Sequence, residues 1–305
     1  MIKVLITGHK GLVGSACVRH FRAKGYDVLI DEYRQYDLRH RTQAMLLFDK
    51  TEPDVIIHCA AKVGGVMANK KDPVGFYSDN AQIQESVLSS AHECGINKVV
   101  SLATSCLFPN SAVPPICEES LMTGPFEQSV SAYATAKLGG YVLSKAYSEQ
   151  YGRNYMTGCP ANVFGLGDTY DDLKSHVVPA LIMKFYRAIY QKVPLEVWGD
   201  GSAVREFIFA DDLAEAIEVM MLNWNKPDLI NLGTGVSTSI RELVLMLKDI
   251  SKYKGEVIYN TSKPTGIDRK TFNIDKIKSL GWEPKHNLYE ALKATWQDYC
   301  TKLYE

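Results

Sequence analysis

The sequence predicts an α/β protein that is built on a doubly wound parallel sheet and ends in a smaller C-terminal α/β domain. Over Met1–Gly165, apolar runs of strand length alternate with periodic segments of helix length, as expected for parallel strands joined by crossover helices. From residue 166 onward the elements become shorter and more often interrupted, which indicates a second domain over the carboxyl edge of the sheet. A length of 305 residues agrees with two domains.

We expect the first domain to comprise residues 1–165 together with residues 205–232, which return to it. The second domain then comprises residues 166–204 and 233–305.

The chain opens with a strand, a glycine turn and a helix. Ile2–Ile6 is rich in β-branched residues and leads to glycines at Gly8, Gly11 and Gly14. In such a turn the first glycine permits a tight bend, the second lets backbone approach a diphosphate, and the third allows close helix–strand packing. The free N–H groups at the start of the helix favour phosphate. This pattern predicts dinucleotide binding; the alternative is a tight turn without a ligand.

The second and third strands are expected at Asp27–Ile30 and Asp54–His58. Residues after the second strand should meet the adenosine ribose, and they are mixed in charge. Acidic side chains there favour a free 2′-hydroxyl, whereas basic ones can hold a 2′-phosphate. The acidic candidates are Asp31 and Glu32, and the basic ones are Lys10, Arg34 and Arg39. We favour NADP(H). After the third strand, the small residues of 60–65 let a flat ring or a diphosphate lie against the backbone.

A further strand, Lys98–Ala103, should place Thr104 and Cys106 at the carboxyl edge of the sheet, where open α/β sheets bind ligands. In the helix that begins at Ala132, Tyr133 and Lys137 are four residues apart and share one face. A neighbouring cation favours a phenolate, so we expect the pKa of Tyr133 to fall from about 10 towards neutrality. Such a tyrosine exchanges a proton with a carbonyl or an alcohol.

The other expected elements follow from the same patterns. Asp211-Asp212 is expected to cap a helix that runs to Leu222, and Ser239 to cap the next helix. The remaining expected helices are Asn80–Cys94, Ala132–Gln150, Ala180–Tyr190, Ile240–Ile250 and Leu288–Leu303; the remaining strands are Asn154–Cys159, Ile230–Leu232 and Glu256–Tyr259; and 266–270 is expected to be a basic loop.

Composition excludes several classes of function. A formal net charge of −1 provides no general field for nucleic acid or an anionic membrane, so we expect neither partner. The seven cysteines form no C-x-x-C pair, which argues against a disulfide framework and against a zinc site; we expect no metal and a reduced, cytoplasmic setting. No apolar segment approaches the ~20 residues of a membrane helix.

The combination of the glycine turn, Thr104 and Tyr133-x-x-x-Lys137 resembles the extended short-chain dehydrogenase/reductase superfamily, whose first domain is a Rossmann fold. Within it the chain is most similar to the family of GDP-L-fucose synthases. The stretches that carry this likeness run nearly end to end: 60–69, 105–109, 175–181, 197–201, 205–207 and 269–270. The resemblance implies an NADPH-dependent 3,5-epimerase/4-reductase of GDP-4-keto-6-deoxy-mannose. It also implies a homodimer formed through the helices expected at 80–94 and 132–150.

By the same resemblance, Cys106 would be the base that removes protons beside the ketone, and His176 the acid on the other face. Tyr133 would protonate the C4 oxygen, Lys137 would hold the phenol and the nicotinamide ribose, and Thr104 stands where the family has serine. The implied cofactor contacts are Gly8, Lys10, Gly11, Leu12, Val13, Gly14, Arg34, Ala60, Ala61, Lys62, Tyr133, Lys137, Pro160, Asn162, Val163 and His176; the implied substrate contacts are Asn162, Lys184, Trp198, Arg205 and Lys270.

The chain departs from the family at Ala161, Lys184, Asp268 and the segment 168–174, and these departures bear on the identity of the sugar. The main alternative is a C4-reductase of a related GDP-4-keto sugar such as a 6-deoxy-heptose, with or without epimerase activity. A 4,6-dehydratase would have Asp-Glu where Ser105-Cys106 stand, and a 4-epimerase would not need Cys106 or His176. A non-enzymatic dinucleotide sensor would be expected to lose Tyr133 or Lys137.

Overall fold

The computed structural model describes residues 1–31, 35–263 and 269–303. Its centre is a six-stranded sheet in the order β10-β5-β4-β3-β1-β2, and every pair in it is parallel. The strands are β1 (Lys3–Thr7), β2 (Asp27–Leu29), β3 (Val55–His58), β4 (Lys98–Leu102), β5 (Asn154–Pro160) and β10 (Leu229–Leu232). The predicted doubly wound parallel sheet is therefore confirmed.

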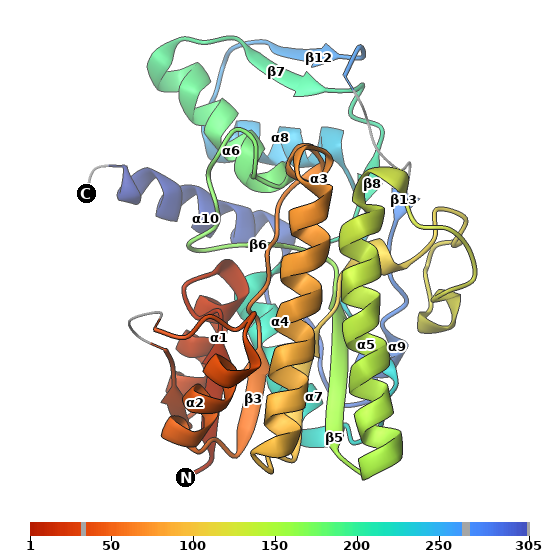
Figure 1. Cartoon of the computed structure of the whole chain (residues 1–305). Helices are drawn as coiled ribbons and strands as arrows, with labels where there is room; N and C mark the ends of the chain where they lie inside the picture. Colours follow the sequence, from red (N-terminus) through yellow and green to blue (C-terminus); the bar gives the residue numbers. More distant parts are fainter. Residues whose placement is uncertain (32–34, 264–268, 304–305) are drawn as a thin grey trace.

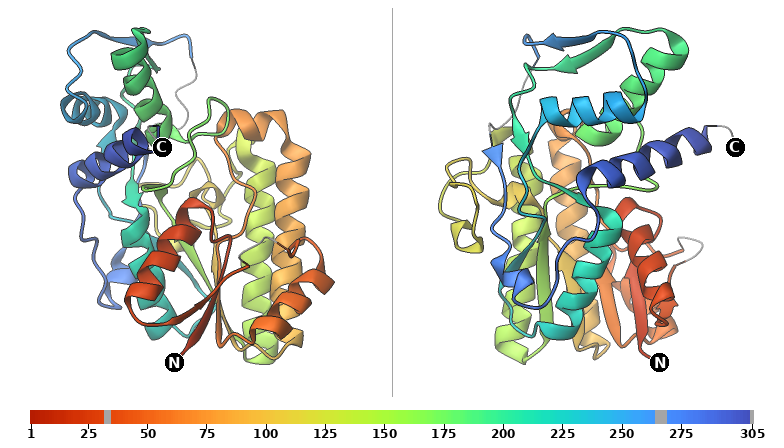
Figure 2. Two further views of the ribbon diagram at one scale, coloured as in Figure 1. Left: turned by 90° about the vertical axis from the view of Figure 1, so that its left-hand side faces the viewer. Right: turned by 180° about the vertical axis from the view of Figure 1, so that it is seen from behind.

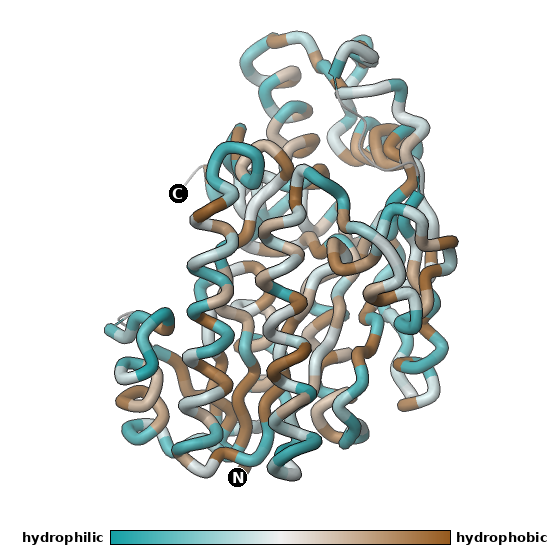
Figure 3. Tube along the Cα trace, turned by 45° about the vertical axis from the view of Figure 1, so that its right-hand side comes forward, coloured by the Kyte–Doolittle hydropathy of each residue, from teal (hydrophilic) through white to brown (hydrophobic). Residues whose placement is uncertain are grey.

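Helices cover both faces of this sheet (Figures 1 and 2). The long helices α4 (Pro73–Glu93) and α5 (Ser131–Tyr151) pack against each other on one face, with α2 (Arg41–Thr51) beside α4. On the other face α1 (Leu12–Ala23) packs against α7 (Ala210–Asn223). In Figure 3 the strands between these helices carry strongly hydrophobic segments, and the residues of β1, β3 and β4 are mostly buried.

The sheet changes winding direction at β1. The chain leaves β1 through α1 to reach β2 on one side, and then returns through α2 to β3 on the other side. The loops after β1 and β3 touch at this point: Gly8 has φ +68°, and a Cβ placed there would lie 2.7 Å from the backbone nitrogen of Ala60. Ligands of open α/β sheets bind at such a switch point.

The second part of the chain lies beyond the carboxyl ends of the strands (Figure 1). Its own hydrophobic core joins α6 (Val177–Tyr186), α8 (Ile240–Ile250), α10 (Leu288–Lys302) and the parallel pair β7 (Leu195–Trp198) with β12 (Val257–Asn260). Two smaller sheets connect the parts: β6 (Asn162–Phe164) pairs with β9 (Phe207–Phe209), and β8 (Val204–Arg205) lies between β11 (Thr238–Ser239) and β13 (Arg269–Lys270). The residue bounds of the two domains stay a proposal.

Most predicted elements occur within a few residues of the expected bounds. Ser239 caps α8 as predicted, in a reciprocal arrangement with Glu242. The predicted Asp211-Asp212 cap is wrong, because α7 starts at Ala210 and Phe209 precedes it without a side-chain cap. The two aspartates instead lie in the first turn, where Asp211 pairs with Arg19 and Asp212 with His286.

The helix expected from Asn80 begins earlier, at Pro73, because Asp72 caps it by accepting from the Gly75 N–H at 3.0 Å. The basic loop expected at 266–270 is a strand at Arg269–Lys270, and its first three residues lie outside the described ranges. The sequence patterns did not predict α2, α3 (Val66–Lys71) or α9 (Asp275–Lys278).

Candidate functional site

The glycine turn after β1 forms a cradle of bare backbone. The N–H of Gly11 donates to the Gly8 carbonyl at 2.9 Å, and a Cβ on Gly14 would collide with that same carbonyl. Gly11 precedes the first helical residue, Leu12, and no side chain caps the helix. The first-turn N–H groups and the positive end of the helix dipole therefore face a space that suits phosphate.

The loop after β3 forms the opposite wall of this cradle. The Thr7 hydroxyl accepts from the Ala60 N–H at 3.2 Å and lies 2.8 Å from Nδ1 of His58, so three residues fasten β1 to β3. His58 is buried, and burial lowers its pKa to about 3, so its ring is neutral at physiological pH. Ala60 and Ala61 present small side chains next to this link, as the sequence predicts.

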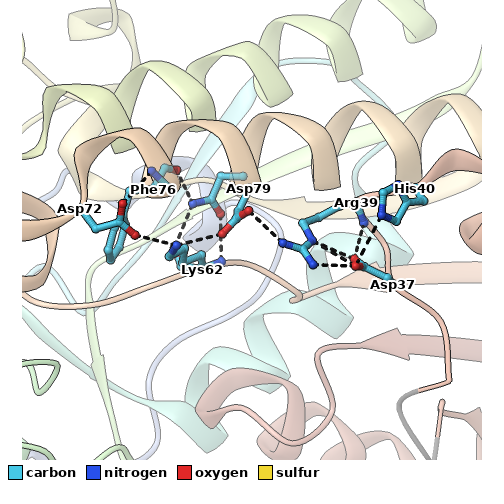
Figure 4. Close-up of polar contacts among 9 residues, drawn as sticks. Asp37, Arg39, His40, Lys62, Asp72, Phe76 and Asp79 are labelled. Atoms are coloured by element: carbon cyan, nitrogen blue, oxygen red, sulfur yellow. Dashed lines mark hydrogen bonds and ion pairs between the residues drawn. The ribbon is translucent and has the colours of Figure 1, made fainter.

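Lys62 makes a different contact from the one expected of a phosphate-binding lysine. Its Nζ lies 2.8 Å from Asp72 and 2.9 Å from Asp79, within a chain of charges that continues through Arg39 to Asp37 (Figure 4). Both carboxylates raise the pKa of Lys62. Its backbone N–H also donates to Asn80 at 3.1 Å, so both the backbone and the side chain of Lys62 are held by the α4 region.

The candidates for contact with the adenosine ribose differ in how the structure holds them. The carboxylate of Asp31 accepts from the N–H groups of Gln35 and Tyr36 at 3.0 and 3.1 Å, so it closes its own turn. Arg39 is paired with Asp37 and Asp79. Lys10 is exposed beside the glycine turn, while Glu32 and Arg34 lie outside the described residues.

Thr104 and Cys106 lie directly beyond the carboxyl end of β4. The Thr104 hydroxyl accepts from the Cys106 N–H at 3.3 Å and starts a single turn of 3₁₀ helix, Ser105–Leu107. The same hydroxyl forms a hydrogen bond with the phenol of Tyr133, which lowers the pKa of that phenol. Tyr133 also packs edge-on against Phe76, with ring centroids 6.0 Å apart. The structure thus brings Thr104, Cys106 and Tyr133 together.

The expected fall in the pKa of Tyr133 is wrong for this site. Removal of the phenol from water is the largest influence and raises its pKa above the ordinary value, and the nearby Cys106 adds to the rise. Lys137 is only 4% exposed, and burial lowers its pKa to about 8. The charge of Lys137 interacts with His58 and Cys59 at the end of β3 and with Cys159 in β5.

His176 is the residue that directly precedes α6. The segment before it is tied to the loop after β3, because the Gly65 N–H donates to the Lys174 carbonyl at 3.0 Å. His176 is exposed, yet the protein around its ring lowers its pKa by desolvation. Among the described residues, no hydrogen bond joins His176 to Cys106.

The candidate substrate residues form two groups. Arg205 and Lys270 are register partners on the neighbouring parallel strands β8 and β13. Burial lowers the pKa of Lys270, and Cys106 is the largest of the influences that oppose this shift. Further out, Lys184 lies over the Trp198 ring at 5.2 Å, and Lys263, which the sequence patterns did not single out, lies over the same ring at 5.9 Å.

Asn162 connects the sheet edge to these strands. Its side-chain amide donates to the Glu206 carbonyl at 2.8 Å, and its backbone N–H donates to the same oxygen at 3.2 Å. Pro160 is the last residue of β5, and Val163 lies in β6, which follows β5 directly along the chain. Sequence reasoning missed Phe76 and Glu206; Glu206 lies inside the Arg205–Phe207 motif, which was its only signal.

This geometry fits a dinucleotide. The glycine turn offers exposed backbone N–H groups at the start of α1, at the switch point of the sheet, and the segment with Tyr133 and Lys137 follows further along the chain. Within the described residues, no group of three or more His, Cys, Asp or Glu side chains is arranged to hold a metal ion. No helix in the described part of the chain is long and apolar enough to cross a membrane.

Comparison with known proteins identifies the family to which this chain is similar. The model of the NAD dependent epimerase/dehydratase family matches residues 4–233. Curated relatives include a GDP-L-fucose synthase of Escherichia coli, 37% identical over 97% of this chain and 95% of that protein. A GDP-L-fucose synthase of Sinorhizobium fredii is 34% identical over 99% and 96%. Among solved structures, a GDP-6-OMe-4-keto-L-xylo-heptose reductase from C. jejuni superimposes with a TM-score of 0.93 and 29% identity, over 99% of this chain and 98% of that one.

Proposed function

The chain belongs to the NAD dependent epimerase/dehydratase family, and from this premise we propose that it is an NADPH-dependent 3,5-epimerase/4-reductase that makes GDP-L-fucose from GDP-4-keto-6-deoxy-D-mannose. The observation that supports this best is the meeting of Thr104, Cys106 and Tyr133 beyond β4. A proton donor for a carbonyl and a thiol suited to work beside that carbonyl are thereby placed in one site.

NADP(H) is the proposed cofactor, and when bound it supplies hydride. The turn residues Gly8, Lys10 and Gly11, with the first helical residues Leu12, Val13 and Gly14, would hold its diphosphate through backbone N–H groups. Ala60, Ala61 and the backbone of Lys62 would line its other side, with Pro160, Asn162, Val163 and His176 beyond. A structure of a GDP-L-fucose synthetase from Naegleria fowleri with bound NADP has a TM-score of 0.91 and 27% identity to this chain.

The epimerisation half is assigned to Cys106 and His176. A proton on a carbon beside a ketone is removed by a base on one face of the ring and returned by an acid on the other face. Thiols and imidazoles titrate on either side of neutrality, at about 8.5 and 6.5, so both exchange protons readily near pH 7. Desolvation holds the pKa of His176 below its usual value, which makes its protonated form a ready donor.

The reduction half is assigned to Tyr133, with Thr104 and Lys137 in support. The phenol keeps its proton at neutral pH because its pKa is raised, and it would donate that proton to the C4 oxygen. Thr104 orients the hydroxyl through their hydrogen bond. Lys137, which is four residues from Tyr133 on the same helix, would supply a cation that stabilises the phenolate that remains after the transfer.

The GDP part of the substrate would lie across the second half of the chain. Arg205 and Lys270 would pair with the diphosphate, with Asn162 nearby. Trp198, which is 43% exposed, offers a flat face for the base, and Lys184 lies over it.

A second candidate function is supported by the solved structures. A GDP-mannoheptose C4 reductase from Campylobacter jejuni with bound NADP has a TM-score of 0.88 and 30% identity over 98% of both chains. Under this reading the chain reduces a related GDP-4-keto sugar, and Cys106 is a small packed residue. A non-enzymatic dinucleotide sensor is disfavoured because Tyr133 and Lys137 are both present at the sheet edge.

One experiment separates the two readings. GDP-4-keto-6-deoxy-mannose and NADPH are incubated with the protein in D₂O, and deuterium at C3 and C5 is followed by NMR. We expect wild type to incorporate deuterium, and Cys106→Ser to stop this while still reducing the unepimerised ketone slowly, since a serine hydroxyl is too weak an acid to act as the base near pH 7. His176→Asn should allow exchange but prevent inversion. Reduction by wild type without any deuterium at C3 or C5 would establish the reductase-only reading.

We further propose a cytoplasmic homodimer that pairs through α4 and α5. Tyr77 on α4 and Val142 and Tyr151 on α5 are exposed at 46%, 48% and 52%, and the same two helices of a second copy would cover such apolar side chains. All seven cysteines are free, as in a reducing compartment. Light scattering that yields only a 34.1 kDa species at micromolar concentration would exclude the dimer.

A further inference from the structure

Two cations are held side by side by the small sheet over the site. In the parallel pair β8–β13, Lys270 is the register partner of Arg205, and Figure 1 labels these strands next to each other. Register partners in a parallel pair point to the same face, about 5 Å apart. Like charges opposite each other destabilise a sheet, and a slip of one residue would send the two side chains to opposite faces. Something other than these two strands must therefore hold the register.

Glu206, the residue after Arg205, supplies three bonds at this place. It is 2% exposed, and one carboxylate oxygen accepts from the N–H groups of Thr234 and Gly235 at 2.5 and 2.8 Å. The other oxygen accepts from the N–H of Phe272 at 2.6 Å, two residues beyond Lys270. The carboxylate of Glu206, next to Arg205, thus binds the chain two residues after Lys270.

The loop after β10 is shaped to receive this carboxylate. A Cβ at Gly233 would collide with Oε1 of Glu206, and Gly235 has φ +69°, so both positions need glycine. Two successive N–H groups that converge on one oxygen form a small anion-binding nest. Burial raises the pKa of Glu206, and the three backbone N–H groups oppose that rise. A buried carboxylate is expensive for a fold, which argues that it has a role.

We propose that Glu206 is a positioning residue that keeps Arg205 and Lys270 in register as one binding site for the diphosphate of a nucleotide sugar. This inference rests on the proposed function for the identity of the ligand. It assigns no chemical step to Glu206, which lies between β8 and β9 and uses both carboxylate oxygens on backbone N–H groups.

Glu206→Gln tests this with little change of shape. Its amide oxygen can still accept from Thr234 and Gly235, but the NH₂ group then meets the N–H of Phe272, so only the link to the Lys270 strand is lost. Glu118→Gln is the control: Glu118 is also buried, at 8% exposure, but it accepts from the Asn231 N–H at 2.9 Å and pairs with Lys276 at 3.6 Å instead of binding the N–H groups of 234, 235 and 272. Calorimetry with GDP, steady-state kinetics and NADPH titration are compared for both variants.

We expect Glu206→Gln to raise the Kd for GDP and the KM for the keto-sugar about tenfold, which corresponds to the loss of one well-placed charged contact. The kcat should stay within about threefold, and the Kd for NADPH should not change. Glu118→Gln should alter none of these constants. In a protein that already carries Lys270→Met, the further change Glu206→Gln should raise the Kd for GDP by less than about twofold. The two effects should not add, because Glu206 acts through Lys270. Glu206→Asp should restore part of the affinity.

Each of three results would overturn the proposal. The first is a Kd for GDP that does not change in Glu206→Gln. The second is a double variant with Lys270→Met in which the two increases in the Kd for GDP multiply, and the third is an equal loss of NADPH binding, which indicates general unfolding. Failure of wild type to bind GDP would overturn it as well. Wild type that binds GDP but does not turn over the keto-sugar would refute only the proposed reaction, since the GDP measurements still test Glu206.

Discussion

Replacement of Lys137 by methionine should stabilise the fold while it destroys reduction. The side chain is 4% exposed on α5, and burial lowers the pKa of its ammonium from 10.5 to about 8. A lysine whose pKa is lower in the folded state binds its proton less tightly there than in the unfolded chain. The folded state therefore bears a cost whenever the lysine is charged in both states, and methionine of similar length removes that cost.

The size of the effect follows from the shift. A difference of about 2.5 pKa units corresponds to about 3 kcal/mol at pH 7, where Lys137 is charged in both states. The cost is fully present below pH 8, declines between pH 8 and 10.5 as the folded lysine loses its proton first, and is about 1 kcal/mol at pH 10. Compared with wild type, Lys137→Met should thus gain most at neutral pH and little at alkaline pH.

Urea unfolding at pH 7 and pH 10, followed by circular dichroism, measures this difference. Lys145→Met is the control on the same helix: its side chain is 38% exposed and pairs with Glu149 at 3.6 Å, so the change should stay within about 0.5 kcal/mol at both pH values. A Lys137→Met variant that is less stable than wild type at pH 7, or whose difference does not vary with pH, would refute the electrostatic reasoning. Ketone reduction by this variant should fall below one hundredth of wild type.

The remaining predictions concern Tyr133 and Asp168. Tyr133→Phe should lower ketone reduction by about 10² to 10⁴-fold and leave the NADPH Kd within threefold, because it removes one proton and little volume; activity close to wild type would exclude Tyr133 as the donor. Asp168 has one carboxylate oxygen that is buried without a partner among the described residues, and burial raises its pKa to about 7. The cost of ionising Asp168 in the folded state begins above about pH 4 and is fully present above about pH 7. Asp168→Asn removes this cost, so it should raise the urea midpoint more at pH 8 than at pH 4. A larger gain at pH 4 would contradict this reasoning.

The fold could be predicted because its signals are local. The glycine turn, the β-branched strands and the helical periodicities are each contained within a few residues, and the structure confirms the sheet that they predict. The helix α2 was missed because its apolar residues Met45, Leu46, Leu47 and Phe48 are consecutive and show little amphipathic period. Pairing of Arg205 with Lys270 across a gap of 65 positions depends on the sheet, and only the family resemblance suggested both residues.

The pKa of Tyr133 shows the limit of such local reasoning. Spacing along a helix pointed to Lys137 as the main influence on the phenol, whereas removal of the phenol from water has the largest effect on its pKa and raises it. The extent of that removal is set by Phe76 from α4 and by the turn after β4, which pack around the ring from elsewhere in the chain. Long-range packing therefore reversed a prediction that was sound for an isolated helix.

The corrected pKa values also bear on the direction of the chemistry. Burial favours the neutral form of every ionisable group, so it raises the pKa of the Tyr133 phenol and lowers that of the Lys137 ammonium. At neutral pH the phenol therefore holds its proton, while the lysine remains mostly charged because its pKa of about 8 is still above 7. A protonated phenol in front of a cation is the state from which a carbonyl oxygen is protonated; oxidation of an alcohol would need the phenolate instead. Burial thus leaves the free site at neutral pH in the protonation state from which reduction of a ketone starts.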